Sequence, residues 1–275
     1  MSEPARLPND GFLELKQRMK ASWMAGDFGQ IARKIASGAE EFIARLDLKP
    51  GMKVLDVACG SGNQSIPAAQ AGATVTGVDI ATNLLEQARV RAAEVGLKIQ
   101  FDEGDAEQLP YGDAQFDVVL SMFGAMFAPR PAKVVNEFKR VCRPGGLLAM
   151  ANWTPEGFVG KSFEVTARHL APPPGILPPV LWGKEEVVRE RFGEGVDLKM
   201  EKRVVMFELD LSPEGAVDFF REYFGPTKVA FSRLDAAGQA RMREDLVALW
   251  TEHNLGTPEH VKIRSEYLEV RARVR

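Results

Sequence analysis

The stretch VLDVACGSGNQSIPAAQAGATVTGVDI, from Val54 to Ile80, decides the fold, because it joins two apolar runs through a glycine-rich turn and ends beside an aspartate. A strand, a glycine turn and a helix place backbone N–H groups at the N-terminus of the helix, where they can bind a ligand. An acid at the end of the next strand is available for ribose hydroxyls. Gly60, Gly62 and Asp79 fill these places. The motif therefore predicts a ligand that resembles a nucleotide.

Two further residues indicate which ligand this is. The spacing from Gly60 to Asp79 also suits a dinucleotide, but the third glycine of that fingerprint would fall at Ser65. Asp56 lies in the strand just before the turn, where a carboxylate repels a pyrophosphate and favours positive charge. S-adenosylmethionine carries a sulfonium and an ammonium group and no phosphate. The pattern therefore favours this cofactor over NAD.

The chain around the motif alternates between predicted strands and helices. The predicted strands are rich in β-branched residues and almost continuously apolar, which is typical of a parallel sheet that helices cover on both faces. We therefore predict an α/β fold with a doubly wound, mostly parallel seven-stranded sheet. Its first strands are predicted at about 53–58, 74–79, 99–105, 116–123 and 146–153, and the helices between them at about 64–72, 82–96 and 131–142.

The regular alternation ends after Trp153. The stretch 171–182 is rich in proline, which does not fit a helix interior or a central strand, so it is predicted to be a loop. Apolar spacing predicts helices at about 12–46, 184–193, 213–225 and 233–254, and strands at about 198–208 and 263–273. We divide the chain into an N-terminal helical cap (1–46), a cofactor-binding core (47–153), helical lid insertions (154–184 and 212–256) and the remainder of the core sheet (185–211 and 257–275).

Composition and charge disfavour several classes of protein. With 275 residues, of which 45% are hydrophobic and 27% charged, the chain is predicted to be globular and soluble. It lacks a long apolar run and the cationic and then apolar order of a signal peptide, so we expect no membrane insertion and a cytoplasmic location. A net charge of −3 and a pI near 5.8 disfavour nucleic acid as a partner. The two cysteines and three scattered histidines predict neither a disulfide framework nor a metal site.

Four segments, in order, resemble the class I S-adenosylmethionine-dependent methyltransferases, especially the ubiquinone and menaquinone biosynthesis type and its small-molecule relatives. The segments are VLDVACGSGN, VTGVDI, GDAEQLPY followed by FDVVLSMF, and RVCRPGGLLAMANW. The resemblance covers about Leu46 to Trp153, and four ordered segments are more specific than one glycine motif. It implies a Rossmann-like fold, S-adenosyl-L-methionine as the cofactor, and methyl transfer.

The resemblance also implies a cofactor site. In it, Asp79 accepts from both ribose hydroxyls and Asp105 accepts from the adenine amino group. Asp56 reaches the amino acid end of the cofactor, directly or through water. The other residues that the resemblance places at the cofactor are Trp23, Phe28, Ala58, Gly60, Gly62, Ile80, Ala106, Ser121, Met122 and Phe123.

Several of these residues have simpler alternative roles. Asp56 could bond only backbone amides in the turn, because short acids often serve turns. Trp23 and Phe28, which the resemblance places on a helix that closes over the cofactor, could be plain core residues. Cys59 is interpreted as a small buried residue, because no base stands beside it.

The predictions about the methyl acceptor depend on the residues of the predicted lid. Methyl transfer from a sulfonium is a displacement with a good leaving group, so a catalytic base is optional. His169 and Tyr223 are the candidate catalytic residues, and a structural role is the alternative for His169. Aromatic residues in and beside the lid predict an apolar or aromatic acceptor, or else a small core or a dimer face. They include Trp153, Phe158, Phe163, Trp182, Phe219, Phe220, Tyr223 and Phe224.

We therefore predict methyl transfer from S-adenosylmethionine to a small, apolar or aromatic acceptor through an oxygen, carbon or nitrogen atom. The sequence motifs of DNA amino-group and cytosine methylation are missing, which favours a small molecule over nucleic acid. A protein or peptide substrate and a non-catalytic S-adenosylmethionine-binding protein stay open as alternatives. Asp56 and Ser65 argue against an NAD-dependent oxidoreductase. The chain is expected to be a monomer or a homodimer.

Overall fold

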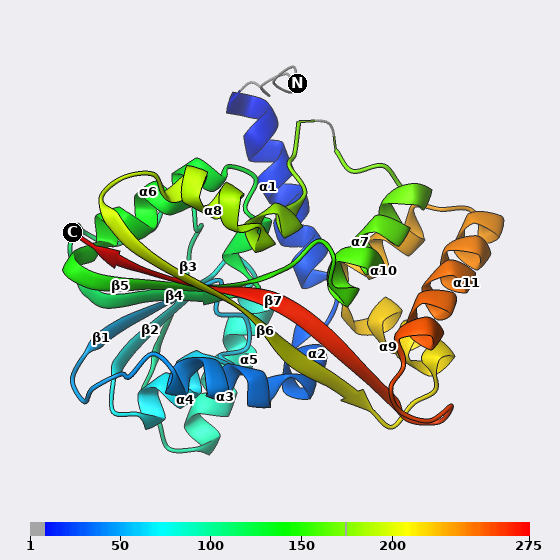
Figure 1. The fold of residues 1–275 in the computed structure, drawn as a ribbon, viewed down its shortest axis with the longest axis horizontal. Helices are drawn as coiled ribbons and strands as arrows, with labels where there is room; N and C mark the ends of the chain where they lie inside the picture. Colours follow the sequence, from blue (N-terminus) through cyan, green and yellow to red (C-terminus); the bar gives the residue numbers. More distant parts are fainter. Residues whose placement is uncertain (1–8, 174) are drawn as a thin grey trace.

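The structure is a computed structural model that describes residues 9–173 and 175–275. Within these residues a seven-stranded sheet forms the centre (Figure 1). Its strands lie in the order β3 (Gln100–Glu103), β2 (Thr74–Asp79), β1 (Lys53–Val57), β4 (Phe116–Met122), β5 (Cys142–Trp153), β7 (Val261–Val274) and β6 (Val196–Leu209). Neighbours pair in parallel except at β7, which is antiparallel to both β5 and β6. The predicted doubly wound, mostly parallel sheet is confirmed.

Helices cover both faces of this sheet (Figure 1). One face carries α3 (Ala36–Ala44), α4 (Ser65–Gln70) and α5 (Thr82–Glu94), and the other carries α6 (Pro131–Val141) and α8 (Glu185–Phe192). Because both faces are covered, β1, β4 and most of β5 are buried, which explains their almost continuous apolar sequences.

The first four strands in the chain run parallel, so their carboxyl ends meet at one edge of the sheet. The glycine turn follows β1, and β1 has β2 on one side and β4 on the other. The strand order therefore reverses at β1. In open α/β sheets, ligands bind in the crevice at such a reversal, outside the carboxyl ends of the strands.

A group of helices gathers at the far end of the long strands β6 and β7 (Figure 1). It consists of α7 (Phe158–His169), α9 (Pro213–Tyr223), α10 (Gly225–Ser232) and α11 (Ala236–His253), and is called the lid below. The sequence predicts two of these helices and misses α7 and α10. The pair Gly225–Pro226 reads as a break, but a proline in the first turn also starts a helix. The buried residues of α7 are Phe158, Gly160 and Val165, so a glycine stands where one of the apolar positions is expected.

The proline-rich stretch departs from its prediction at one end. Pro179–Gly183 forms a short 3-10 helix, η2, which buries Trp182 near Phe192 of α8. This helix lies so near the end of β5 that a Cβ on Gly183 would be 2.3 Å from the carbonyl oxygen of Trp153. Trp182 is therefore a core residue beside the sheet and not a wall of the lid.

Two glycines let the N-terminal helices α1 (Asn9–Met24) and α2 (Phe28–Lys34) meet the lid. A Cβ on Gly225 would lie 2.0 Å from the carbonyl oxygen of Ser22, and one on Gly26 would lie 2.3 Å from that of Tyr223. The backbones meet directly at these points, so there is no room for a side chain.

Gly225→Ala is therefore expected to destabilise the fold by about 1 to 3 kcal/mol, because the added methyl group overpacks a backbone contact. Gly215→Ala in α9 is the matched control, since a Cβ there would come no closer than 3.4 Å to a neighbouring atom. Urea unfolding of both variants measures the difference. Equal stability of the two variants would contradict the direct contact between α1 and α10.

Candidate active site

A cavity of about 660 Å³ lies at the carboxyl edge of the sheet. Sites for small molecules usually measure about 300 to 1,000 Å³, so a nucleoside-sized ligand fits. The walls come from one face of α1, from the glycine turn, and from the segments that follow β2, β3 and β4. The cavity therefore lies where the strand order reverses, beside the glycine turn.

The glycine turn is held in shape by Asp79. Its Oδ2 accepts from the N–H of Gly60 and its Oδ1 accepts from the N–H of Ala81, each at 2.8 Å. Gly60 and Gly62 have φ angles of +52° and +81°, which glycine adopts without strain. Burial raises the pKa of the Asp79 carboxyl, and the N–H donors oppose this rise. One carboxylate thus ties the end of β1 to the end of β2.

Asp56 is fully buried behind the turn. The hydroxyl of Ser65 donates to Asp56 Oδ2 over 2.6 Å, and Oδ1 has no partner among the described residues. Burial raises the pKa of Asp56 to about 7; the bond from Ser65 opposes the rise, and the charge of Asp79 adds to it. Ser65, at the place of the third glycine, is therefore the hydrogen-bond partner of Asp56. A buried carboxylate oxygen without a partner fits a cationic ligand nearby better than a pyrophosphate.

A lysine ties α1 to the opposite wall of the cavity. Lys16 donates to Asp105, and its Nζ also lies 2.6 Å from Glu107 Oε2. Glu107 is buried and accepts a second charged bond, of 2.7 Å, from Arg130 Nε. Because these partners follow β3, the ion pairs hold α1 over the cavity.

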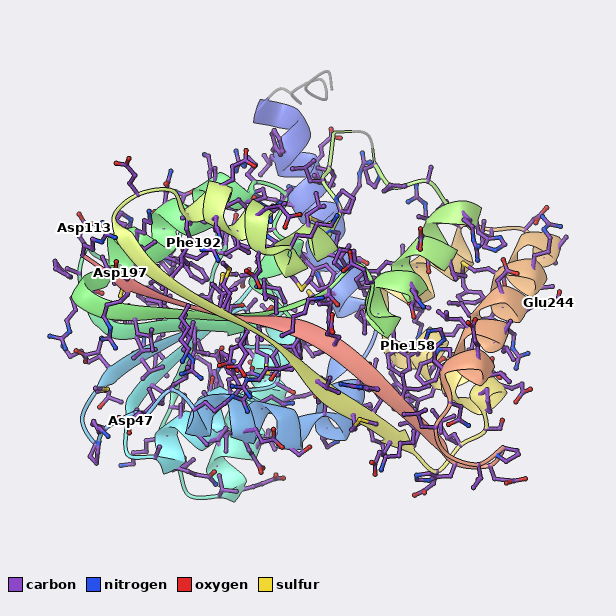
Figure 2. The ribbon with its side chains drawn as sticks, in the orientation of Figure 1. Asp47, Asp113, Phe158, Phe192, Asp197 and Glu244 are labelled. Carbon is purple, nitrogen blue, oxygen red and sulfur yellow. The ribbon has the colours of Figure 1, made fainter. Side chains whose placement is uncertain are left out.

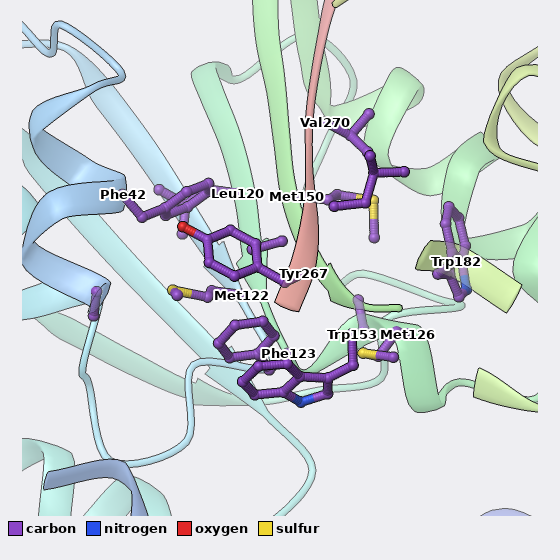
Figure 3. Packing of buried hydrophobic residues seen from close by; sticks show 14 of the residues in the cluster. Phe42, Leu120, Met122, Phe123, Met126, Met150, Trp153, Trp182, Tyr267 and Val270 are labelled. Carbon is purple, nitrogen blue, oxygen red and sulfur yellow. The ribbon is translucent and has the colours of Figure 1, made fainter. Parts of the chain in front are cut away.

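Phe123, directly after β4, forms the inner wall. Its φ of +61° is unusual for a residue with a side chain, and Ala58 after β1 has a φ of +56°. The Phe123 ring stacks on Trp153, with the ring centroids 3.5 Å apart and the planes 8° apart (Figure 3). Backbone strain of this kind collects at functional sites, where the surrounding packing maintains it.

A second cavity, of about 80 Å³, lies between Phe123 and the lid. Trp23, Phe28, Phe123 and Phe127 line both cavities. On the lid side the walls are mainly aromatic and include Phe158, Phe163, Phe220, Phe224 and Trp250. Phe158 lies where the lid meets the sheet, whereas Glu244 projects from the outer side of α11 (Figure 2). Among residues 9–173 and 175–275, the lining of this cavity holds no acidic or basic side chain.

The structure brings most of the predicted cofactor residues to the first cavity. Asp56, Gly62 and Ser121 do not line it, and the Ser121 hydroxyl accepts from the N–H of Ala125 at 2.9 Å. The predicted residues that do line it are Trp23, Phe28, Ala58, Gly60, Asp79, Ile80, Asp105, Ala106, Met122 and Phe123.

The two candidate catalytic residues line neither cavity. His169 Nε2 lies 2.8 Å from Asp245 Oδ2, a contact that joins α7 to α11. The ring of Tyr223 packs on Phe219, with the centroids 4.9 Å apart. In this conformation neither side chain reaches the space beside Phe123.

The sequence patterns did not predict that residues of α1 before Trp23 line the first cavity. Leu13, Lys16 and Lys20 also line the first cavity, and Lys20 pairs with Glu103 at its rim. These residues precede Trp23 at intervals of three and four positions, which places them on one face of the helix. Counting back from Trp23 at helical spacing would have found them.

Known proteins share this arrangement of sequence and fold. Residues 55–150 match the model of a family described as a methyltransferase domain. The chain is 36% identical over 239 residues to an uncharacterized protein of Mycobacterium tuberculosis, across 85% of this chain and 87% of that protein. It is 42% identical over 116 residues to methyltransferase GfsG of Streptomyces halstedii, across 41% of this chain and 42% of that protein.

A solved structure of phosphoethanolamine N-methyltransferase 2 from Haemonchus contortus, in complex with S-adenosyl-L-methionine, shares the fold. Its TM-score is 0.54 at 18% identity, across 87% of this chain and 53% of that chain. The chain belongs to the class I S-adenosylmethionine-dependent methyltransferases. It is an enzyme of this class, with S-adenosylmethionine as its cofactor.

None of the helices within residues 9–173 and 175–275 is long and apolar enough to cross a membrane. In the same part of the chain, no group of three or more His, Cys, Asp or Glu side chains is placed to hold a metal ion.

The raised pKa of Asp56 predicts a pH-dependent stability. Between its ordinary pKa near 4 and its folded value of about 7, the folded protein holds a proton that the unfolded chain releases, so rising pH removes stability. Asp56→Asn has no such proton. From pH 5 to pH 8 the wild type should therefore lose about 2 to 3 kcal/mol relative to this variant.

Urea unfolding of both proteins at the two pH values measures this difference. The exposed Asp47 has a φ of +52°, a conformation that asparagine tolerates, so Asp47→Asn is the matched control and should follow the wild type. A constant difference between wild type and Asp56→Asn would mean that Asp56 is ionised throughout.

Proposed function

We propose that the enzyme methylates a small, apolar or aromatic acceptor that occupies the second cavity while the cofactor occupies the first. The observation that carries this proposal is the aromatic wall that the cavities share, formed by Trp23, Phe28, Phe123 and Phe127. Because the same residues line both cavities, the cavities adjoin at this wall. We place the methyl group of a cofactor in the first cavity at this junction, next to an acceptor in the second cavity. Apolar walls with few polar groups favour an uncharged acceptor.

For the cofactor, we propose that Asp79 holds the ribose hydroxyls and Asp105 the adenine amino group. Each Asp79 oxygen that accepts one N–H keeps a second lone pair for a hydroxyl. Asp56 does not line the first cavity, and from behind the turn it would favour the cationic amino acid end when its carboxyl is ionised. The remaining proposed cofactor contacts are Trp23, Phe28, Ala58, Gly60, Ile80, Ala106, Met122 and Phe123, while Gly62 and Ser121, which do not line the first cavity, would shape the turn and the wall behind them.

When bound, the cofactor supplies a methyl group on a sulfonium. The sulfur leaves as a neutral thioether, so the leaving group needs no proton. The residues of the chain then have to position the acceptor in line and to keep water out. The aromatic walls serve both purposes. Because the described lining of the second cavity holds no titratable side chain, it supports transfer without a base from the protein.

A base from the lid stays a prediction for His169 and Tyr223. His169 would have to leave Asp245, and Tyr223 would have to leave Phe219, before either approached an acceptor in the second cavity. Acceptors that arrive without a proton on the attacking atom need neither residue.

The ribose assignment predicts a loss of cofactor affinity in Asp79→Asn, by about 2 to 4 kcal/mol, because an amide NH₂ group cannot accept from a hydroxyl or from the Gly60 N–H. Calorimetry with S-adenosylhomocysteine measures this change. The thermal unfolding temperature of the variant checks that the turn still forms.

Asp102→Asn is the matched control for this change. Asp102 lies nearby on β3 but bonds Tyr111 and Gln100 instead of lining the cavity, so its variant should bind as the wild type does. If a folded Asp79→Asn protein binds S-adenosylhomocysteine with unchanged affinity, the ribose hydroxyls do not bond to Asp79.

The function is tested by incubating the protein with methyl-labelled S-adenosylmethionine and a panel of phenols, quinone precursors, carboxylic acids and amines. We expect mass increase in an uncharged aromatic acceptor. For that acceptor, Phe163→Leu should lower kcat/KM about tenfold and change affinity for S-adenosylhomocysteine less than threefold, because only acceptor positioning is lost.

Tyr223→Phe is the matched lid variant, because it changes an aromatic residue that lines neither cavity. Wild-type kinetics in this variant limit Tyr223 to packing, whereas a large loss of kcat assigns its hydroxyl a part in the transfer. Methylation of charged peptides alone, with Phe163→Leu fully active, would contradict the proposed acceptor.

A further inference from the structure

The second cavity contains three hydroxyl groups, and they are not equivalent. Ser162 Oγ donates to the carbonyl oxygen of Phe158 at 2.9 Å, and Thr166 Oγ1 donates to that of Ser162 at 3.0 Å. Thr227 also lines the cavity, and within residues 9–173 and 175–275 its hydroxyl is not among the groups that donate to a neighbouring carbonyl or side chain. Of the three, Thr227 is the one with a proton free for a ligand.

The position of Thr227 in the chain explains why its hydroxyl is free. A threonine inside a helix usually donates to the carbonyl four residues earlier. Thr227 is the third residue of α10, so the residue four positions earlier, Tyr223, belongs to α9. The carbonyl oxygen of Tyr223 lies against Gly26, at the contact between α1 and the lid. The break between α9 and α10 therefore leaves the Thr227 hydroxyl without the backbone acceptor that a helix would otherwise supply.

We propose that Thr227 determines acceptor specificity by donating a hydrogen bond to one polar atom of an otherwise apolar, uncharged acceptor. This inference rests on the proposed function, because it requires the acceptor to occupy the second cavity. A site that hydrogen-bonds one polar group of its substrate discriminates against an analogue that lacks the group, because the site is then left with an unpaired donor. The other polar side-chain groups of the lining are the two bonded hydroxyls and the indole N–H groups of Trp23, Trp153 and Trp250.

The walls have to move for this contact to form. A cavity of about 150 Å³ holds benzene, whereas this one measures about 80 Å³. The rings of Trp23 and Phe224 meet edge to face with centroids 5.6 Å apart, and Phe224 directly precedes α10. The ring that an acceptor would have to displace therefore lies next to the helix that carries Thr227.

The test uses small fluorinated probes and the protein saturated with S-adenosylhomocysteine. Titrations followed by ¹⁹F NMR give the affinities of 4-fluorophenol and fluorobenzene, which differ by one hydroxyl group. In Thr227→Val the affinity ratio of 4-fluorophenol to fluorobenzene should fall about fivefold, while fluorobenzene itself binds within twofold of the wild type. Fivefold is the value of one neutral hydrogen bond of about 1 kcal/mol.

Thr166→Val is the matched control, because its hydroxyl is already committed to a backbone carbonyl, and it should leave the affinity ratio unchanged. An unchanged ratio in Thr227→Val overturns the inference, and so does an equal fall in both variants. A third probe, 4-fluorobenzylammonium, examines whether the aromatic walls select a cation instead. Tighter binding of this cation than of 4-fluorophenol also overturns the inference.

Calorimetry separates failure of this inference from failure of the proposed function. If the probes bind, S-adenosylhomocysteine binds every variant equally and the ratio does not respond to Thr227, the specificity assignment alone is wrong. If Phe163→Leu and Thr227→Val leave binding of both uncharged probes untouched, the acceptor does not occupy this cavity and both proposals fail.

Discussion

The carboxylate of Asp79 is the constraint on which the site depends. It accepts from the Gly60 N–H in the turn after β1, which links the turn to the end of β2, and from the N–H of Ala81 just before α5. Both amides would lack this partner without it, at a cost of about 1 to 3 kcal/mol for each unpaired buried group. Phe123 is held from β5 instead, since its N–H donates to the carbonyl oxygen of Ala151 at 2.9 Å and its ring stacks on Trp153. Asp79 and Phe123 thus lie on opposite walls of the same cavity, at the carboxyl edge of the sheet.

The cofactor half of the molecule could be predicted from sequence because its chemistry is local. Apolar strands that are buried on both faces, a turn with φ angles that favour glycine, and an acid at a strand end all leave marks within a few residues. Ser65 shows where such reasoning falls short. Its difference from glycine is visible in the sequence, but its bond to Asp56 depends on how the helix packs against the strand.

The acceptor half could be predicted only in outline, because its walls come from segments far apart in the chain. The aromatic composition of the lid is visible in the sequence. Tertiary packing, however, decides that Phe220 lines the second cavity and that Trp182 is buried elsewhere. The end of α9 could be predicted, because Gly225–Pro226 reads as a break, but the start of α10 at the same pair could not. Aromatic residues from segments of similar composition can therefore lie in different parts of the structure.

The two carboxylates that meet Lys16 have a consequence for the kinetics of cofactor exchange. Asp105 is the one proposed to meet the adenine, and Glu107 is buried beside Arg130. If Asp105 exchanges the lysine for a ligand, Lys16 keeps Glu107, so α1 stays attached while the site fills or empties. The pair of Lys20 with Glu103 is more exposed, and dissolved salt screens exposed charges more than buried ones. Ionic strength should therefore act on how fast the rim of the cavity opens, while the attachment of α1 at Glu107 persists.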